Sequence, residues 1–227
     1  MKVALILARK NSKRIKNKNT KLFCGKPMIY WPSKIAKESN LFDKIYVSTD
    51  SINTSNLSKK LRLSVPFLRK KKYATDTAST LSVVKNFIEN VEKKEKIKIS
   101  YLCCIYASAP FFNTKDLKES FSMLLKQKRE FVFLASQIDS LFLRSFTRGK
   151  NRINLINKKY LNYRSQDLDK CYIDLGQFYW GTASSWTKQK AIFSSKSNIV
   201  IRKKENYIDI NTKKDWKIAV KIFNKKL

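Results

Sequence analysis

The sequence predicts an α/β fold, in which a three-layer, mostly parallel, Rossmann-like sheet is covered by helices on both faces. Two observations support this prediction. Short apolar runs alternate with amphipathic segments of helical period along most of the 227 residues, and the hydrophobic content of 43% suffices for a sizeable core. We therefore expect one domain that spans residues 1–227.

The expected strands are short apolar runs bounded by polar or turn-forming residues. In chain order they are Val3–Leu7, Ile45–Ser48, Val65–Leu68, Tyr101–Tyr106, Phe131–Ala135, Gln177–Gly181 and Ile199–Ile201. The first of these runs contains no polar residue, as is typical of a strand buried on both faces. Strands that alternate with helices favour a parallel sheet, because each crossover returns the chain through a helix.

The expected helices carry apolar residues at intervals of three and four. In chain order they are Pro27–Glu38, Ile52–Leu61, Thr80–Lys93, Thr114–Lys126 and Thr212–Asn224. Pro27 suits a helical first turn, whereas Pro32 would kink that helix or delay its start. Thr114 and Thr212 are each followed within three residues by an aspartate, which is typical of a helix N-cap.

The segment from about residue 140 to residue 175 interrupts this alternation. It is polar and rich in turn-forming residues, and it lacks a long helical period. Long irregular insertions in compact domains are usually functional loops or oligomerisation arms. We expect a protruding element there.

The formal charge of +32 suggests an anionic partner but does not identify it. Nucleic acid and polyanionic small molecules would both be attracted by such a field. The basic residues are spread over the whole chain and are mostly lysine, which favours a general compositional bias over a nucleic-acid surface. We therefore expect no nucleic-acid partner. No apolar run approaches the length of a membrane span, so we expect no membrane partner and a cytoplasmic location.

The chain contains no histidine, and its four cysteines show no CxxC spacing. A zinc site of the usual kind is therefore not predicted. Histidine is also the usual general base and the usual partner of a nucleophilic serine or cysteine. Any chemistry must rely on carboxylates, lysine, arginine and a bound metal.

A cationic loop follows the first expected strand. The stretch "ARKNSKRIKNKNTK" places seven Lys or Arg between Arg9 and Lys21, at the carboxyl end of Val3–Leu7. Ligands of open α/β sheets bind at this edge. The glycine-rich dinucleotide fingerprint and the P-loop motif are both absent. Two interpretations remain open, a polyphosphate site built from side chains and a solvated loop in a lysine-rich chain.

Six motifs in order resemble the nucleotide-sugar cytidylyltransferases that activate sialic-acid-like sugars. They are "LILARKNSKRIKNKNTKLF", "FDKIYVSTDS", "VPFLRKKKYATDTAST", "CCIYASAPF", "YRSQDLDKCYIDLGQFYWGTA" and "YIDINTKKDW", and together they extend from Val3 to Trp216. The later motifs are most similar to the pseudaminic acid cytidylyltransferase branch. The resemblance implies transfer of CMP from CTP to the anomeric hydroxyl of a nonulosonic acid, with release of pyrophosphate. It also implies a homodimer whose dimerisation arm covers about residues 140–175.

The resemblance implies roles for individual residues. Arg9 and Lys18, with Asp209, would be the catalytic group, because fixed cations stabilise a leaving pyrophosphate. The residues implied at the nucleotide are Ala8, Ser12, Lys13, Asn19, Arg69, Ala78 and Thr80, and those implied at the sugar are Tyr106, Arg164, Gln166, Gln177 and Tyr179. An alternative for Arg164 is a salt bridge within the arm. Tyr179 and Trp180 alternate on a strand, so we expect one of them in the core.

The metal site that the resemblance implies departs from the family pattern. Mg²⁺ or Mn²⁺ would be bound near the C-terminus, where relatives carry two aspartates two residues apart. This chain has Asp209 and Asn211 there. An asparagine offers a hard cation only a neutral carbonyl oxygen, which is a weaker ligand. Three alternatives to the main interpretation follow: a CMP-sialic, CMP-legionaminic or other keto-sugar acid synthetase, a catalytically impaired nucleotide-binding paralogue, and a nucleic-acid binder.

Overall fold

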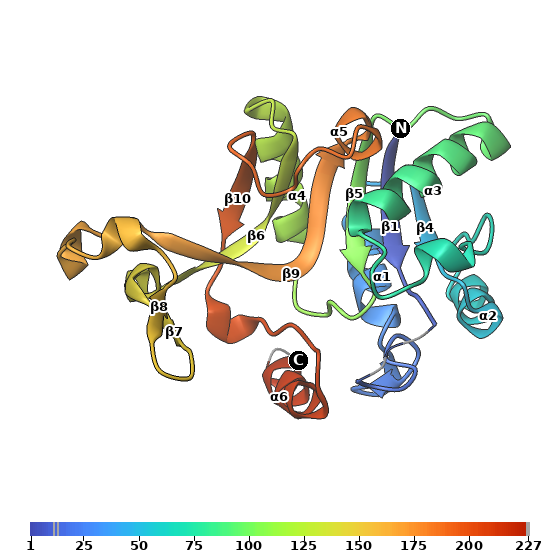
Figure 1. Ribbon diagram of the computed structural model, residues 1–227. Coiled ribbons are helices and arrows are strands. Elements are labelled where there is room, and N and C mark those ends of the chain that lie inside the picture. Colours follow the sequence, from blue (N-terminus) through green and yellow to red (C-terminus); the bar gives the residue numbers. More distant parts are fainter. Residues whose placement is uncertain (11, 13, 226–227) are drawn as a thin grey trace.

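The computed structural model describes residues 1–10, 12 and 14–225. Six strands form the main sheet in the order β10-β6-β9-β5-β1-β4 (Figure 1). The strand bounds are β1 Lys2–Leu7, β2 Leu22–Phe23, β3 Lys26–Pro27, β4 Lys44–Ser48, β5 Tyr101–Tyr106, β6 Phe131–Ile138, β7 Phe146–Arg148, β8 Ile153–Leu155, β9 Cys171–Thr182 and β10 Ser197–Ile201. Only β9 runs antiparallel to its neighbours in this sheet. The predicted α/β, mostly parallel fold is confirmed.

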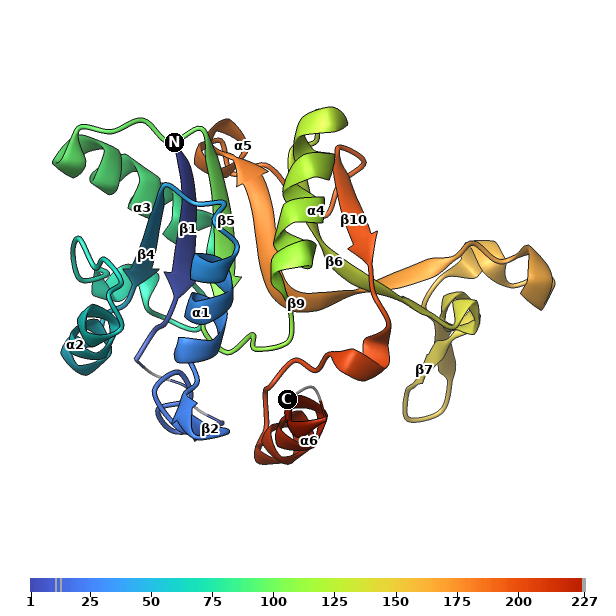
Figure 2. The same ribbon diagram turned by 180° about the vertical axis from the view of Figure 1, so that it is seen from behind.

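Helices pack against both faces of the sheet (Figures 1 and 2). The α-helices are α1 Tyr30–Glu38, α2 Ile52–Lys60, α3 Thr80–Glu95, α4 Thr114–Lys126, α5 Ala183–Thr187 and α6 Lys213–Asn224, and the short 3-10 helices are η1 Lys71–Tyr73, η2 Ser140–Arg144, η3 Lys158–Tyr160, η4 Ser165–Asp167 and η5 Lys204–Asn206. α1 and α4 cover one face, and α3 and α5 cover the other. In the described part of the chain, no helix is both long and apolar enough to span a bilayer.

The core consists of two clusters, one on each face of the sheet. Alternate residues of β1 serve them in turn: Ala4 and Ile6 belong to one cluster, and Val3 and Leu5 to the other. This division follows from the two-residue period of a strand. Trp180 and Tyr179 of β9 are divided in the same way, and both side chains are buried.

Several predicted elements differ from the observed ones. Val65–Leu68 is not a strand, because Ser64 makes only an isolated bridge to Tyr46 and Pro66 has no N–H for a ladder. The first helix begins at Tyr30 instead of Pro27, which pairs in the small β2–β3 hairpin. The helix includes Pro32 in its first turn, where no N–H partner is needed.

β9 is much longer than predicted and connects two environments. Near its end, Gly181 pairs with Leu102 of β5 and with Phe131 of β6 inside the core. At its start, Cys171–Asp174 pairs only with the end of β6. The sheet register shifts between these two halves, at the bulge opposite Phe133 and Ala135.

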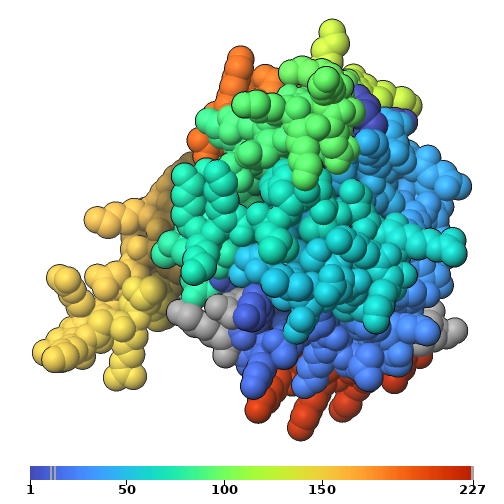
Figure 3. Space-filling view, turned by 90° about the vertical axis from the view of Figure 1, so that its right-hand side faces the viewer, coloured from blue at the N-terminus to red at the C-terminus, as the bar shows by residue number. Residues whose placement is uncertain are grey.

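Between β6 and β9 the chain leaves the body of the molecule. We call residues 140–175 the arm; it contains η2, the β7–β8 hairpin, η3 and η4 and includes the start of β9. The arm projects from one side of the molecule (Figures 1 and 3). Nine of the sixteen exposed large hydrophobic side chains in the described part of the chain lie on it, namely Leu141, Phe142, Phe146, Ile153, Ile156, Leu161, Tyr163, Tyr172 and Ile173.

Candidate active site

A cleft of about 700 Å³ opens at the carboxyl ends of β1 and β5. Its volume lies in the usual range for small-molecule sites. Its walls come from the loop after β1, the segment from residue 69 to residue 83, the end of β5 and the chain before α6. The charged side chains that line it are Arg9, Arg14, Lys18, Arg69, Asp76 and Asp209. A second cavity adjoins it and shares Arg9, Ser12, Thr75 and Asp76.

Ala8 and Arg69 form the buried end of the cleft. The backbone N–H of Ala8 donates to Ser48 O at 3.0 Å, and this extends the β1–β4 pairing past the strand end. Arg69 Nε donates to Ser48 Oγ at 2.9 Å, and its Nη2 donates to Ser48 O at 2.6 Å. Burial lowers the pKa of Arg69 to about 10. The guanidinium is therefore fixed by protein contacts before any ligand arrives.

Arg9 and Asn19 lie on the loop that follows β1. Arg9 Nη1 forms an ion pair with Asp76 Oδ1 at 2.5 Å across the cleft. Asn19 Nδ2 donates to Arg9 O at 3.0 Å and so ties the two ends of the loop together. Both partners of the Arg9–Asp76 pair remain about one-third exposed or more, so an anion entering the cleft can compete with Asp76 for this guanidinium.

Lys18 reaches from the same loop to the chain before α6. Its Nζ donates to Ile210 O at 2.7 Å. Burial lowers the pKa of Lys18, and the nearby positive charges of Arg14 and Arg9 lower it further, whereas Asp209 raises it. Cations placed so close together repel one another without a counter-ion. An anionic ligand would relieve this repulsion.

Asp209 and Asn211 stand at the mouth of the cleft, and their side chains are already hydrogen bonded. Asn211 Nδ2 donates to Asp209 Oδ2 at 2.5 Å, and Asn211 Oδ1 accepts from Arg14 Nη2 at 2.9 Å. No cluster of three or more His, Cys, Asp or Glu residues suited to a metal occurs among the described residues. The pair therefore does not offer two free ligand oxygens. Asp209 alone suits a hard cation that takes its remaining ligands from phosphate and water.

A chain of polar side chains connects the nucleotide end of the cleft to β9. Thr80 Oγ1 lies 3.1 Å from Tyr106 Oη, and Tyr179 Oη donates to Asp174 Oδ2. The rings of Tyr106 and Tyr179 meet edge to face at 5.7 Å. Burial raises the pKa of Tyr106 to about 12 and raises the pKa of the Asp174 carboxyl. These tyrosines thus keep their protons at neutral pH.

The other predicted residues occupy different surroundings. Gln177 is buried, its Oε1 accepts from Phe111 N at 3.2 Å, and its Nε2 donates to Leu175 O at 2.8 Å. Arg164 and Gln166 are exposed at η4 on the arm, outside the cleft of their own chain. Ser12 lines the cleft, Ala78 lines it beside Thr80, and Lys13 lies outside the described residues.

Sequence reasoning did not single out Arg14, Asp76 or Asp174. Arg14 was one of seven basic residues in its loop, and nothing in the linear order separates it from Lys10 or Lys16. The partner of Arg9 is 67 positions away, at Asp76. A loop with more cations than its known ligand needs is the signal that could have led to Arg14.

Comparisons with known proteins agree with this geometry. A cationic cleft at the strand ends of an α/β sheet defines a protein that binds an anionic ligand, such as a nucleotide. The sequence profile of the family described as cytidylyltransferase matches residues 3–216. The chain belongs to this family and is a nucleotidyltransferase, which confirms the resemblance found in the sequence.

Similar proteins cover nearly the whole chain. A pseudaminic acid cytidylyltransferase of Campylobacter jejuni is 33% identical over 218 residues, which are 96% of this chain and 94% of that protein. A bifunctional protein of Helicobacter pylori, named pseudaminic acid cytidylyltransferase and UDP-2,4-diacetamido-2,4,6-trideoxy-beta-L-altropyranose hydrolase, is 38% identical over 86% of this chain and 37% of its own length. An N-acylneuraminate cytidylyltransferase of Streptococcus agalactiae is 27% identical over 94% of this chain and 51% of its own length.

Solved structures share the fold at low sequence identity. A CMP:2-keto-3-deoxy-manno-octonic acid synthetase complexed with CTP gives a TM-score of 0.73 at 12% identity, over 100% of this chain and 99% of that chain. A 4-diphosphocytidyl-2C-methyl-D-erythritol synthase gives a TM-score of 0.67 at 10% identity, over 98% of this chain and 97% of that chain. These likenesses concern the arrangement of strands and helices.

Proposed function

We propose that this protein transfers CMP from CTP to the anomeric hydroxyl of a nonulosonic acid, in particular pseudaminic acid, and releases pyrophosphate. The observation that supports this most directly is the cationic cleft at the end of β1, in a chain of the cytidylyltransferase family. The relative from Campylobacter jejuni, which is 33% identical over 96% of this chain, supports the choice of sugar.

The reaction needs positioning and charge more than covalent chemistry. The sugar hydroxyl attacks the α-phosphorus, the bond to the bridging oxygen breaks, and pyrophosphate leaves on the opposite side. Arg9 and Lys18 would bind the triphosphate and offset the charge that develops on the leaving group. Ser12, Lys13 and Asn19 would complete the loop around the phosphates. A chain without histidine can carry out such a reaction, because preorganised cations act on the transition state directly.

The cytidine would occupy the inner end of the cleft. Ala8 would offer backbone groups to the base, and Arg69 would supply a fixed cation beside it. Ala78 and Thr80 line the same end of the cleft. The Thr80–Tyr106 contact at 3.1 Å would then couple the nucleotide side of the site to the sugar side.

Mg²⁺ or Mn²⁺ is the proposed cofactor, held by Asp209 together with oxygens of the triphosphate. Asp209 lines the cleft and is exposed at its mouth, and this supports the assignment. When bound, the ion would offset charge on the phosphates. Asn211 would take no direct part in binding it, since its carbonyl oxygen accepts from Arg14.

The sugar-binding set remains a proposal with two parts. Tyr106, Tyr179 and the buried Gln177 would form the inner wall, with Gln177 acting by holding Phe111 and the backbone of β9 in place. Arg164 and Gln166 lie on the arm, so they would reach a sugar only if the arm met another copy of the chain. Arg164 would then pair with the sugar carboxylate through its two-pronged guanidinium.

A homodimer formed through the arm is therefore part of the proposal. Exposed apolar residues that gather on one projection are typical of an interaction surface. A second copy is the occupant that would also bring Arg164 to a cleft. A cytoplasmic location and the absence of a nucleic-acid partner stay predictions from composition.

Pyrophosphate release tests the proposed activity. The assay compares CTP with ATP, UTP and GTP, each with a panel of nonulosonic acids at millimolar Mg²⁺ or Mn²⁺. We expect release with CTP and pseudaminic acid to exceed release with every other pair. Greater release with a sialic or legionaminic acid would reassign the sugar, in line with the 27% identical N-acylneuraminate cytidylyltransferase. Release with no pair would favour the paralogue that binds nucleotide without catalysis.

A further inference from the structure

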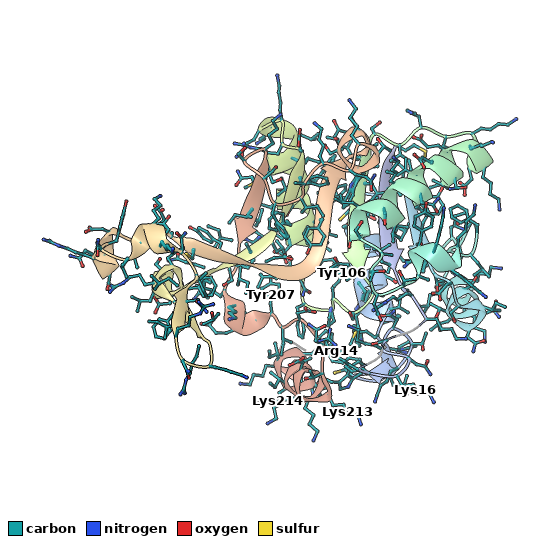
Figure 4. All side chains as sticks on the ribbon, viewed as in Figure 1. Arg14, Lys16, Tyr106, Tyr207, Lys213 and Lys214 are labelled. Atoms are coloured by element: carbon teal, nitrogen blue, oxygen red, sulfur yellow. The ribbon has the colours of Figure 1, made fainter. Side chains whose placement is uncertain are left out.

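Arg14 lies at the mouth of the cleft and is connected to Asp209 through one amide. Arg14 Nη2 donates to Asn211 Oδ1 at 2.9 Å, and Asn211 Nδ2 donates to Asp209 Oδ2 at 2.5 Å. Figure 4 shows Arg14 between the N-terminal loop and α6, below Tyr106. The guanidinium therefore sits beside the carboxylate that would hold a metal ion, at the edge of the proposed triphosphate site.

Only an amide can make both of these hydrogen bonds at position 211. It donates through nitrogen to the carboxylate and accepts through oxygen from the guanidinium. An aspartate there would present an oxygen to Asp209 at a similar distance, and the two carboxylates would repel unless a cation or proton intervened. The asparagine therefore suits an arrangement in which the guanidinium, held by that amide, is the cation at this position.

The charge around Arg14 also favours an anionic ligand. Arg14, Arg9 and Lys18 line one cleft, and the charges of both arginines help to lower the pKa of Lys18. Hydrogen bonds to described residues occupy one of the five N–H donors of Arg14. The side chain is also exposed, so its remaining donors can reach a ligand at the mouth of the cleft.

We propose that Arg14, oriented by Asn211, binds the triphosphate of CTP and gives this protein an affinity for CTP that does not depend on a metal ion. The proposal rests on the proposed function, because it assumes that CTP occupies this cleft. It goes beyond that function by naming a binding residue and by giving Asn211 a role as its positioning residue.

Equilibrium binding tests the role of Arg14. Isothermal titration calorimetry measures the affinity of the full chain for CTP in EDTA and again in Mg²⁺. The variants are Arg14→Gln and, as a matched control, Lys214→Gln, which removes one positive charge from an exposed site at the start of α6. We expect Arg14→Gln to weaken CTP binding in EDTA by about tenfold or more, the usual loss for a charge-assisted contact, and Lys214→Gln to leave it unchanged.

Asn211→Asp tests the positioning role. We expect this variant to bind CTP about tenfold more weakly than the wild type in EDTA and to regain affinity when Mg²⁺ is added, because a second carboxylate would then need a cation. Thermal melting of each variant verifies the fold. Wild-type affinity of Asn211→Asp in EDTA would overturn the positioning role.

The two proposals fail in different ways. If the wild type binds CTP in neither EDTA nor Mg²⁺, the proposed function is wrong. If it binds CTP only with Mg²⁺, or if Arg14→Gln binds CTP in EDTA like the wild type, the role of Arg14 is wrong while the function stands. Cytidine, which carries no phosphate, is followed by line broadening of its proton NMR signals. An equal loss of cytidine and CTP binding in Arg14→Gln would also overturn a contact to phosphate.

Discussion

The cleft at the end of β1 and the arm differ in how far a single chain completes them. In the cleft, charged groups are held by partners of the same chain: Arg69 by Ser48, Lys18 by Ile210 O, and Asp209 by Asn211. On the arm, large hydrophobic side chains such as Phe146 and Ile153 remain more than half exposed. The cleft is thus preorganised within one copy, whereas the arm presents apolar surface to a partner.

The difference indicates where the two halves of the reaction depend on the protein. Nucleotide binding should need only the single chain, because its cations are fixed by short contacts to the sheet and its loops. Sugar binding should need the arm of a second copy, because Arg164 and Gln166 lie away from the cleft. Variants of the two regions should therefore affect different steps.

The largest effect is expected from Lys18→Ala in the cleft. This change removes a partly buried cation from the triphosphate site, and we expect kcat/KM for CTP to fall about 10²- to 10³-fold, as when a fixed electrostatic group is lost. Steady-state pyrophosphate release measures it. Lys214→Ala serves as the control on an exposed site, and equal kinetics of the two variants would contradict the assignment of Lys18.

A smaller effect is expected from the double variant Phe142→Asp and Ile153→Asp on the arm. Charges on this apolar surface should dissociate the homodimer, and sugar turnover should fall about tenfold or more while CTP affinity stays the same. Light scattering gives the molecular mass, and calorimetry gives CTP binding. A dimer that survives these substitutions with normal turnover would show that the arm has another role.

β9 allows the two regions to be compared within one strand. A Cβ at Gly181 would lie 2.6 Å from Phe131 Cε1 and 2.7 Å from Trp186 Nε1, so Gly181→Ala should lower the free energy of unfolding by about 1–3 kcal/mol. Ile173→Ala lies at the exposed, arm end of β9 and should cost less than about 0.5 kcal/mol. Urea denaturation measures both, and equal costs would contradict the packing described for β9.

The most gradual effect is expected from pH. The pKa of Lys18 is lowered from 10.5, and CTP binding favours its charged form. CTP affinity should therefore decline as the pH rises through this lowered pKa, which is below 10.5, and should be retained at lower pH. Lys18→Arg should keep its affinity to higher pH, because arginine stays protonated. Identical alkaline limbs for wild type and Lys18→Arg would show that another group titrates.

The sequence predicted the main sheet well but described β9 and its surroundings poorly. Apolar runs such as Tyr101–Tyr106 match β5 residue for residue, because burial on both faces leaves a continuous signal. The start of β9 carries polar and exposed residues, so Cys171–Leu175 did not resemble a strand. Pairing with β6 holds that segment extended, and this contact between distant parts of the chain is invisible in local sequence.

The candidate site was predictable in its residue types but not in its connections. The cationic loop and Asp209 stood out in the sequence, and the cleft contains Arg9, Lys18, Arg69 and Asp209 together. The Arg14–Asn211–Asp209 chain joins residues almost 200 positions apart, and the exposed position of Arg164 depends on the course of the arm. Such relations depend on tertiary structure.

A crystal structure of the protein with CTP tests the central claim most directly. The account predicts the triphosphate in the cleft at the end of β1, with Lys18 and Arg9 turned toward it and the Arg9–Asp76 pair opened. CTP bound elsewhere, with Arg9 still paired to Asp76 and Lys18 still on Ile210 O, would contradict it.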